Sequence, residues 1–282
     1  MTVDLVHVFS YEGKGGNPCP VVCDAAGMSD SEMQAVARDA GHESGFVLPA
    51  EGAEFDYRFR YWVPNHEMEM CGHATVGALW LLAGKGLLTA GEVRIRTLSG
   101  AVSGFIGRDA AGAPVVEVTQ PAGTVRELNP ADSDAVLDVL GMERSDLLDL
   151  PVQNAVTSRI KTIVPVRDVG RLNALTPDFD RVKGLCDAIG STGLYPYAPQ
   201  NEAQLFDARQ FPRSSGYPED AATGIAATAL SFGLLKNGLV APNAEPIHIF
   251  QGRAMGHLSE IKVRLGFAGD TAIGCLLGGA VR

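Results

Sequence analysis

Two long stretches of the sequence are apolar at almost every position. Residues 71–82 and 221–235 contain no Asp, Glu, Lys or Arg, each follows a loop with proline and acidic residues, and each is followed by glycine within a few positions. A helix that is apolar on nearly every face is buried on all sides. Glycine just after such a segment is typical of a helix C-terminus. The pattern therefore predicts two buried helices.

Alternation of apolar and polar positions marks strands around both helices. Residues 57–63 alternate cleanly and residues 115–119 more loosely, while residues 93–97 and 247–250 follow the two apolar segments. Strict alternation is the pattern of a strand with one buried face. Because the order loop, helix, strand occurs twice, we expect an α+β protein of two similar, pseudo-symmetric domains. Each would be a curved mixed sheet around a central buried helix.

The expected boundary between the two halves lies where proline, glycine and charged residues cluster, at 121–130. This divides the chain into residues 1–120 and 121–282, with the last strand able to pack on the first half. Asn129 and Pro130 precede a segment, 132–140, that is typical of a surface helix opening the second half.

Composition narrows the possible functions. The chain of 282 residues has 23 Lys and Arg against 33 Asp and Glu, a formal net charge of −10. An acidic surface repels phosphate backbones, which disfavours general nucleic-acid binding. The longest apolar run, near 74–83, is far shorter than the ~20 residues of a membrane helix. Five scattered cysteines form no disulfide framework and the start lacks a basic signal region, so a cytoplasmic protein is expected.

The N-termini of the two apolar helices are candidate anion sites. A helix N-terminus offers unpaired backbone N–H groups and the positive end of the helix dipole. Gly72 and Gly224 lie at these positions, where the absence of a side chain lets a ligand approach the backbone. The alternative is that both glycines only allow close helix packing. Their occurrence in both halves favours a ligand, and a carboxylate fits such a site.

Five ordered motifs carry a family resemblance: 16–18 with 21–22, 43–48, 71–77, 218–224 and 251–256. With these motifs the sequence resembles the phenazine-biosynthesis PhzF-like family, within the diaminopimelate epimerase and proline racemase fold group, from about residue 3 to 279. The resemblance implies two pseudo-symmetric domains, no organic cofactor, no metal, and usually a homodimer. It also implies chemistry in which a proton is removed from carbon and returned.

Three polar residues are candidates for that chemistry. Glu43 lies between a glycine turn and an apolar segment that predicts a buried strand, and the resemblance places the main catalytic carboxylate here rather than a solvated turn residue. His73 follows Gly72, where the helix dipole favours a neutral imidazole that binds or carries a proton, with a structural histidine as the alternative. Asp220 is suited to cap Thr223 or a nearby amide, and the resemblance makes it substrate-facing.

Cys71 is the position that departs from the racemases and epimerases of the fold group. By resemblance, those enzymes pair this cysteine with a second one at the other helix, and here the second position is Ala221. Two-thiol inversion is therefore not expected. A helix N-terminus lowers a thiol pKa and predicts a thiolate at Cys71. The cysteine could support Glu43, act against it from the opposite face, or be a small buried apolar residue.

The resemblance assigns the remaining substrate contacts to Ser44, Gly72, Ala74, Thr223, Gly224 and Ile225. Ile225 stands where phenazine-pathway members tend to carry serine. An isoleucine side chain cannot form a hydrogen bond, so this position argues against the dihydro-hydroxyanthranilate of phenazine synthesis as the substrate.

The segment from His66 to His73 is rich in residues that could bind a metal. Its spacing matches neither H-E-x-x-H nor paired C-x-x-C, so no metal is expected. Glu67 and Glu69 are instead expected to be solvated or dimer-facing loop charges.

The sequence favours a cofactor-independent isomerase that moves a proton on a small carboxylate, with Glu43 as general acid and base. Three alternatives stay open at this point. They are an epimerase or racemase that uses Glu43 with Cys71, a secondary-metabolism enzyme that cleaves or rearranges a ring-opened amino acid, and a non-catalytic small-molecule binding protein.

Overall fold

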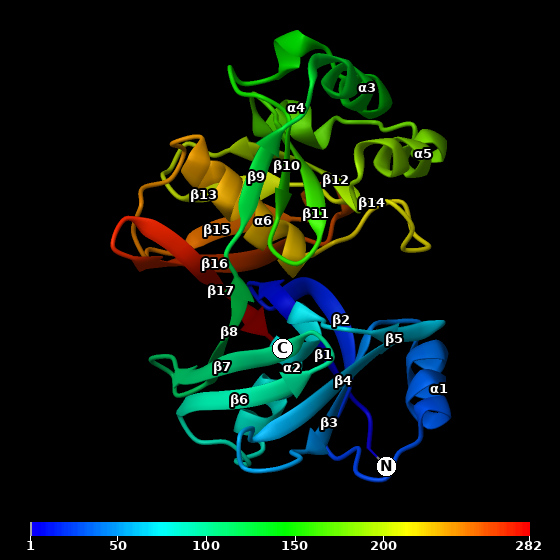
Figure 1. Cartoon of the computed structure of the whole chain (residues 1–282), viewed down its shortest axis with the longest axis vertical. Helices are drawn as coiled ribbons and strands as arrows, with labels where there is room; N and C mark the ends of the chain where they lie inside the picture. The colour runs from blue at the N-terminus through cyan, green and yellow to red at the C-terminus, as the bar shows by residue number, and fades with distance from the viewer. Residues whose placement is uncertain (1) are drawn as a thin grey trace. The chain divides into compact units, whose positions relative to one another are not determined.

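The chain divides into two compact units, and each contains a mixed sheet with few helices (Figure 1). The computed structural model describes residues 2–282. The first unit comprises Met1–Thr119 and the returning segment Leu277–Arg282, and the second comprises Gln120–Leu276. Two strands cross the boundary along the chain, β8 (Pro114–Pro121) and β17 (Thr271–Gly278).

Within its described residues, 2–119 and 277–282, the first unit holds eight further strands and two helices. Its helices are α1 (Asp30–Ala40) and α2 (Gly72–Gly84). Its strands are β1 (Asp4–Tyr11), β2 (Lys14–Val22), β3 (Ser44–Pro49), β4 (Tyr57–Val63), β5 (His66–Met68), β6 (Gly91–Thr97), β7 (Gly100–Arg108) and β18 (Ala280–Val281). The main ladder runs β18–β1–β2–β3–β4–β6–β7–β8, with the short β5 paired to β4.

The second unit holds eight further strands, four helices and two single 3₁₀ turns. Its helices are α3 (Pro130–Leu140), α4 (Val169–Asn173), α5 (Phe179–Ile189) and α6 (Gly224–Lys236), and its 3₁₀ turns are Arg144–Asp146 and Arg253–Met255. Its strands are β9 (Thr124–Glu127), β10 (Gln153–Val156), β11 (Ile160–Pro165), β12 (Gly193–Pro199), β13 (Leu205–Ala208), β14 (Phe211–Pro212), β15 (Ile247–Gln251) and β16 (Ser259–Ala268).

The strand pairing follows the same series in the two units. Along β1–β2–β3–β4–β6–β7 the pairs are antiparallel, parallel, antiparallel, parallel and antiparallel. Along β10–β11–β12–β13–β15–β16 the same five relations occur in the same order. A parallel pair requires a crossover connection. Each of these four crossovers contains a helix, and α2 and α6 occupy the last crossover of their own unit.

The two predicted apolar helices form and are buried. In the first unit α2 packs against β1, β2, β3 and β7, and in the second α6 packs against β9, β10, β11 and β16. Both helices have the same C-terminal arrangement, in which Leu87 N–H donates to Leu82 and Leu239 N–H donates to Leu234, each at 2.9 Å. Gly86 and Gly238 adopt the positive φ that this ending requires, 72° and 70°.

The predicted strands are confirmed at 57–63, 93–97, 115–119 and 247–250, as parts of β4, β6, β8 and β15. The predicted surface helix is also present as α3, with the Asn129 side chain accepting from the Asp132 amide. Helices α1 and α5 were not predicted from the sequence. Both are short and amphipathic, and α1 begins with a capping box in which Ser29 and Glu32 bond each other's backbone amides.

Helix α1 covers a separate part of the first unit's core. Met33 and Ala37 pack with Val22, Phe46 and Trp62 of the neighbouring strands. This packing fixes where α1 ends and where the chain enters β3. No helix within residues 2–282 combines the length and apolar character needed to cross a membrane.

Candidate active site

Glu43 lies in the short connection between α1 and β3. Gly41 ends α1 in a left-handed conformation with φ of 70°, and its amide donates back to Ala37 and Arg38. Ser44, two residues before the core residue Phe46, then begins β3. The Glu43 side chain is 34% exposed, so its carboxylate lies at the edge of the core and is reachable from solvent.

Cys71 and His73 meet this carboxylate at the beginning of α2. The Cys71 thiol donates to Glu43 Oε2 over 3.3 Å, and its Sγ lies 3.2 Å from His73 Nδ1. His73 Nδ1 is also 3.4 Å from the same Oε2 of Glu43. The structure thus joins three of the four residues predicted to be catalytic into one cluster within the first unit.

The thiol of Cys71 is protonated, which corrects the expectation of a thiolate. Burial and the negative charge of Glu43 raise the pKa of Cys71 well above its ordinary value. The backbone amide of Ala74 acts in the opposite direction, as expected at a helix N-terminus, but it is the weaker influence. The position of Cys71 at the start of a helix could be predicted from the sequence, whereas its contact with the Glu43 carboxylate could not. Cys71 is therefore a hydrogen-bond donor to Glu43 at neutral pH.

His73 is a neutral imidazole. Burial lowers its pKa, with a smaller contribution from His42, while Glu43 acts in the opposite direction. Its Nδ1 is hydrogen-bonded with Cys71 Sγ at 3.2 Å and lies 3.4 Å from Glu43 Oε2. Nε2 is buried and has no hydrogen-bond partner within residues 2–282.

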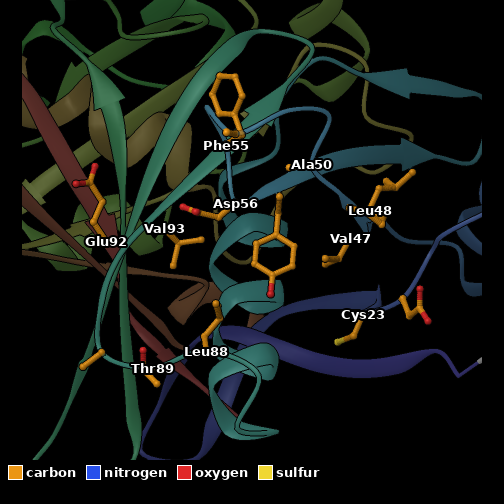
Figure 2. Close-up of a pocket in the computed structure, with 15 residues that line it drawn as sticks. Cys23, Val47, Leu48, Ala50, Phe55, Asp56, Leu88, Thr89, Glu92 and Val93 are labelled. Carbon is orange, nitrogen blue, oxygen red and sulfur yellow. The ribbon is translucent and has the colours of Figure 1, made fainter.

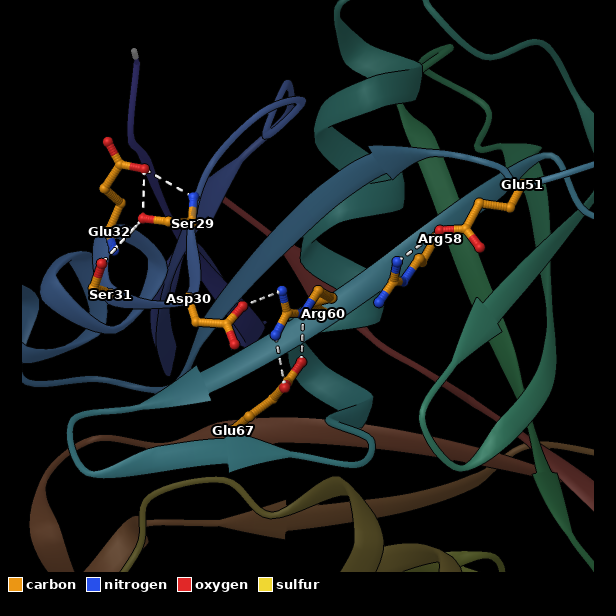
Figure 3. Close-up of polar contacts among 8 residues, drawn as sticks. All are labelled: Ser29, Asp30, Ser31, Glu32, Glu51, Arg58, Arg60 and Glu67. Atoms are coloured by element: carbon orange, nitrogen blue, oxygen red, sulfur yellow. Dashed lines mark hydrogen bonds and ion pairs between the residues drawn. The ribbon is translucent and has the colours of Figure 1, made fainter.

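An arginine connects the two segments that carry these groups (Figure 3). Arg60 of β4 forms two hydrogen bonds to Glu67 of β5, at 2.6 and 2.8 Å, and a third to Asp30 at the start of α1, at 2.7 Å. Helix α1 leads to Glu43, and β5 leads to Cys71. Glu67 is only 19% exposed, is paired and lies in β5, so of the two expected roles, a solvated or a dimer-facing loop charge, the solvated one was wrong.

The neighbouring predicted contact residues have packing roles. A side chain at Gly72 would approach Leu277 to 2.8 Å, so this glycine permits close packing in addition to any ligand role. Ala74 is fully buried against Gly45. Ser44 is also fully buried, and its hydroxyl donates to the carbonyl of His42 at 3.1 Å.

The remaining predicted residues lie at the start of α6 in the second unit, where Asp220 and Thr223 are hydrogen-bonded to each other. Thr223 is the N-cap residue of α6, and its hydroxyl donates to the Asp220 carboxylate. Gly224 begins the helix and is buried, while Ile225 is partly buried in its first turn. Cys71 directly precedes the first residue of α2, and Thr223 directly precedes the first residue of α6. Thr223, and not Ala221, is therefore the residue that corresponds to Cys71. Neither residue is a cysteine, so α6 has no second thiol at its start.

Gln251 organises this group and was not predicted as a site residue. Its side chain is fully buried at the end of β15. Oε1 accepts from Tyr195 OH at 2.9 Å and from the Thr223 amide at 3.2 Å. Nε2 donates to the Asp220 carbonyl at 2.6 Å and to Thr223 Oγ1 at 3.1 Å. The motif at 251–256 pointed to this residue, but only the fold shows what it contacts.

A buried ion pair holds the loop in front of Asp220. Arg209 forms a bidentate pair with Glu219 at 2.8 and 2.7 Å, and the two side chains are 7% and 10% exposed. The same guanidinium donates to the backbone carbonyls of Leu172 and Leu175 and lies 4.9 Å from the ring centroid of Phe211. The sequence indicated an acidic loop at 218–220, but nothing in it predicted that Glu219 would pair with Arg209.

The first unit also contains a cavity of about 850 Å³ (Figure 2). It includes Val47–Pro49 at the far end of β3 from Glu43, together with Cys23, Tyr57 and Val93. Neither Glu43, Cys71 nor His73 lines it. The cavity is therefore separate from the cluster described above.

Glu43, Cys71 and His73 are the residues that could hold a metal ion, since their ligand atoms all lie within 4.8 Å of one another. His66, Glu67 and Glu69 do not join this group within the described part of the chain.

Comparison with known proteins agrees with this fold. A PhzF-family protein from Bacillus anthracis aligns with a TM-score of 0.88 at 24% identity, covering 99% of this chain and 95% of that one. A probable proline racemase from Agrobacterium radiobacter aligns with a TM-score of 0.62 at 16% identity, covering 100% and 91%. The chain thus has the mixed-sheet fold shared by PhzF-family proteins and proline racemases.

The sequence comparison identifies the family. The model of the phenazine biosynthesis-like protein family, PhzC-PhzF, matches residues 6–277. An uncharacterized isomerase from Deinococcus radiodurans is 32% identical over 282 residues, covering 97% of this chain and 90% of that protein. The chain therefore belongs to the phenazine biosynthesis-like family, as the sequence motifs indicated.

Proposed function

We propose that this protein is a cofactor-independent isomerase that moves a proton on a small carboxylate, with Glu43 as general acid and base. The proposal rests on family membership, on relatives named isomerases, and on the cluster around Glu43. A carboxylate with one side open to solvent can accept a proton from a bound substrate. The neutral thiol of Cys71 donates a hydrogen bond that orients it, and the His73 imidazole lies next to both groups.

The distance between Glu43 and Cys71 favours isomerisation over stereo-inversion. In inversion, the carbon lies between one group that removes its proton and another that returns it from the opposite face. Each group approaches the carbon to about 3–3.5 Å, so the two stand roughly 6–7 Å apart. Glu43 Oε2 and Cys71 Sγ are only 3.3 Å apart and in direct contact. This single observation supports proton transfer on one face of the substrate.

The proposed reaction needs one base that also acts as the acid. Glu43 removes a proton from carbon, and the electron pair of the broken C–H bond moves into a neighbouring unsaturated or carbonyl system. The protonated Glu43 then returns the proton to another carbon on the same face and is a carboxylate again. The hydrogen bond from Cys71 to Oε2 keeps the carboxylate oriented through the cycle, and the His73 ring lies beside both groups.

The start of α2, which carries Cys71 and His73, is proposed to bind the substrate carboxylate, and the start of α6 is proposed as an anion site of the second unit. The N-cap residues Cys71 and Thr223 make no side-chain hydrogen bond to their own helices. Their side chains turn instead to Glu43 and Asp220. First-turn amides without a side-chain acceptor can bind an anion. In this proposal the two units are pseudo-symmetric halves, which the matching order of strand pairs supports.

Proton exchange followed by NMR tests the proposal. The protein is incubated in deuterated water with small cyclic carboxylates and amino acids, beside Glu43→Gln, Cys71→Ala and the exposed-loop control Glu69→Gln. Substrate-dependent C–H exchange that Glu43→Gln abolishes and Cys71→Ala reduces only modestly supports the single-carboxylate isomerase. Equal loss in Glu43→Gln and Cys71→Ala, with inversion at the exchanged carbon, would favour the epimerase. Ligand binding without exchange in any variant would favour a binding protein.

A further inference from the structure

The polar atoms of the Glu43 cluster form a nearly equilateral triangle. Its sides are 3.2 Å from Cys71 Sγ to His73 Nδ1, 3.3 Å from Sγ to Glu43 Oε2, and 3.4 Å from Nδ1 to Oε2. In a tetrahedral zinc site with bonds of about 2.0–2.3 Å, ligand atoms lie roughly 3.3–3.6 Å apart. The triangle therefore already has nearly the size of one face of a zinc coordination tetrahedron.

The donor types also suit a thiophilic cation. Thiolate, imidazole and carboxylate are the protein ligands of Zn²⁺, and sites with three of them leave the fourth position to water or another ligand. Cys71 and His73 are buried, whereas Glu43 is 34% exposed, so the ion would enter from the Glu43 side. Weakly thiophilic cations such as Mg²⁺ prefer all-oxygen ligands and do not fit this set.

The backbone that carries the thiol is held in place. The Thr75 hydroxyl donates to the Cys71 carbonyl at 2.7 Å, and it is paired with Tyr61 OH at 2.6 Å. Both Thr75 and Tyr61 are fully buried. Ligands supported by such buried contacts need little rearrangement to bind an ion.

We propose that Glu43, Cys71 and His73 form an inhibitory binding site for Zn²⁺ or a similar thiophilic divalent cation. A bond forms from the ion to each of the three ligand atoms. The Cys71 S–H bond breaks and its proton goes to solvent, while the neutral His73 imidazole binds the ion through Nδ1 and carries its proton on Nε2. No oxidation or reduction takes place.

Inhibition follows because the ion occupies the carboxylate that removes the substrate proton. This consequence rests on the function proposed above, whereas ion binding itself does not. Metal-binding motifs in the sequence did not predict this ion site, because Glu43 precedes Cys71 by 28 residues and such motifs have short spacings.

The test measures ion binding directly on the full, chelator-treated chain. Zn²⁺ is titrated by calorimetry, and Co²⁺ by visible absorption, where a thiolate ligand gives a sulfur-to-cobalt charge-transfer band. Cys71→Ser, His73→Gln and Glu43→Gln are compared with Cys275→Ala, which removes a buried cysteine of the second unit. Circular dichroism and thermal melting confirm that each variant is folded.

The expected result is one ion per chain, a charge-transfer band, and release of one proton. Substituting a residue that only hydrogen-bonds to a metal ligand costs about 10–100-fold in affinity, so replacing a ligand itself should cost at least that much. Cys275→Ala should bind as the unchanged protein does. Absence of binding, retention of full affinity in folded Cys71→Ser, or a cobalt spectrum without a sulfur band would overturn the proposal. These outcomes do not depend on finding a substrate, so they are separable from failure of the isomerase assignment.

Discussion

The starts of α2 and α6 use the same helical framework for different chemistry. Each helix has 13 residues, begins at glycine, and is buried on nearly all sides. At α2 the N-cap side chain is a thiol in contact with a titratable carboxylate and an imidazole. At α6 the N-cap is a threonine inside a hydrogen-bond network built around Gln251. Under the proposed function, the start of α2 carries the groups that react, and the start of α6 holds Asp220 in position.

The largest effect on catalysis is expected from substituting the two carboxylates beside these helices, and the two substitutions should act on different kinetic constants. Glu43→Gln removes the proposed base and should lower kcat/KM by about 10²–10⁴-fold, the usual contribution of general acid–base catalysis. Asp220→Asn keeps an acceptor for the Thr223 hydroxyl and should act mainly on KM. Steady-state kinetics on a substrate found by proton exchange provides the measurement. A larger kcat loss for Asp220→Asn would reverse the roles assigned to the two termini.

The ion pair in front of α6 should matter most for stability. Arg209→Ala leaves Glu219 buried without its partner, which typically costs about 3–5 kcal/mol. Urea unfolding followed by circular dichroism measures this loss. Arg144→Ala is the control, because its pair with Asp134 is exposed and should contribute less than about 1 kcal/mol. Similar losses for both variants would contradict the burial argument.

Removing Gln251 should destabilise the second unit and its site together. Gln251→Ala leaves the Tyr195 hydroxyl and the Thr223 amide without this acceptor, and each buried unpaired group costs about 1–3 kcal/mol. Gln251→Glu keeps the acceptor and should recover part of the stability. Gln34→Ala, which removes a single partly buried hydrogen bond to Pro64, serves as the reference. A Gln251→Ala protein as stable as Gln34→Ala would show that the network does not position Asp220.

A smaller effect is expected from the thiol at α2. Cys71→Ala removes one hydrogen bond to Glu43 and should lower kcat/KM by about tenfold, since a thiol is a weak donor and its bond to a carboxylate falls at the lower end, about 1.5 kcal/mol, of hydrogen bonds to charged groups. Cys71→Ser retains a donor and should lie between the alanine variant and the unchanged protein. A loss in Cys71→Ala as large as that in Glu43→Gln would instead indicate two proton-transfer groups.

The smallest effect concerns the pH dependence of stability. The pKa of His73 is lowered in the folded protein from 6.5, so the unfolded chain binds a proton at this residue first as the pH falls. The neutral, buried His73 therefore contributes its full share to the free energy of unfolding above about pH 7, and this share is progressively lost below pH 6.5. The groups facing the imidazole are Glu43, Cys71 and His42. The free energy of unfolding is measured by urea unfolding in the presence of a chelator between pH 8 and 5. It should fall less steeply with decreasing pH in His73→Gln than in His66→Gln, the control at an exposed residue. Equal slopes in the two variants would refute this contribution of His73.

The framework of the fold could be predicted from local sequence. The apolar segments and alternating stretches identified α2, α6, β4, β6, β8 and β15, and the helix opening the second half begins at Pro130, two residues before the predicted segment 132–140. Helix α6 starts at Gly224, three residues after the apolar stretch begins. The Thr223 amide bonds Gln251 from a distant strand, which holds the preceding residues outside the helix. Such a long-range contact leaves no local sequence signal.

The chemistry of the candidate site was predictable only in part. Residue types and family motifs singled out Glu43, His73 and Cys71, but the thiol was expected to be ionised. Burial and the adjacent carboxylate determine its protonation instead. Glu67 was expected in solvent because the sequence does not show that Arg60, seven residues earlier, faces it across a strand pair.

The sequence by itself determined that two apolar helices would be buried, that strands would surround them, and that an imidazole and a thiol would lie at one helix start. These follow from periodicity and residue type, which are local properties of the chain. The tertiary structure decided that Glu43, Cys71 and His73 share one contact, that Gln251 connects Tyr195, Thr223 and Asp220, and that Arg209 is paired in the core. Distances between residues far apart in sequence, and their burial, exist only in the folded chain, and they set both proton affinity and hydrogen-bond partners.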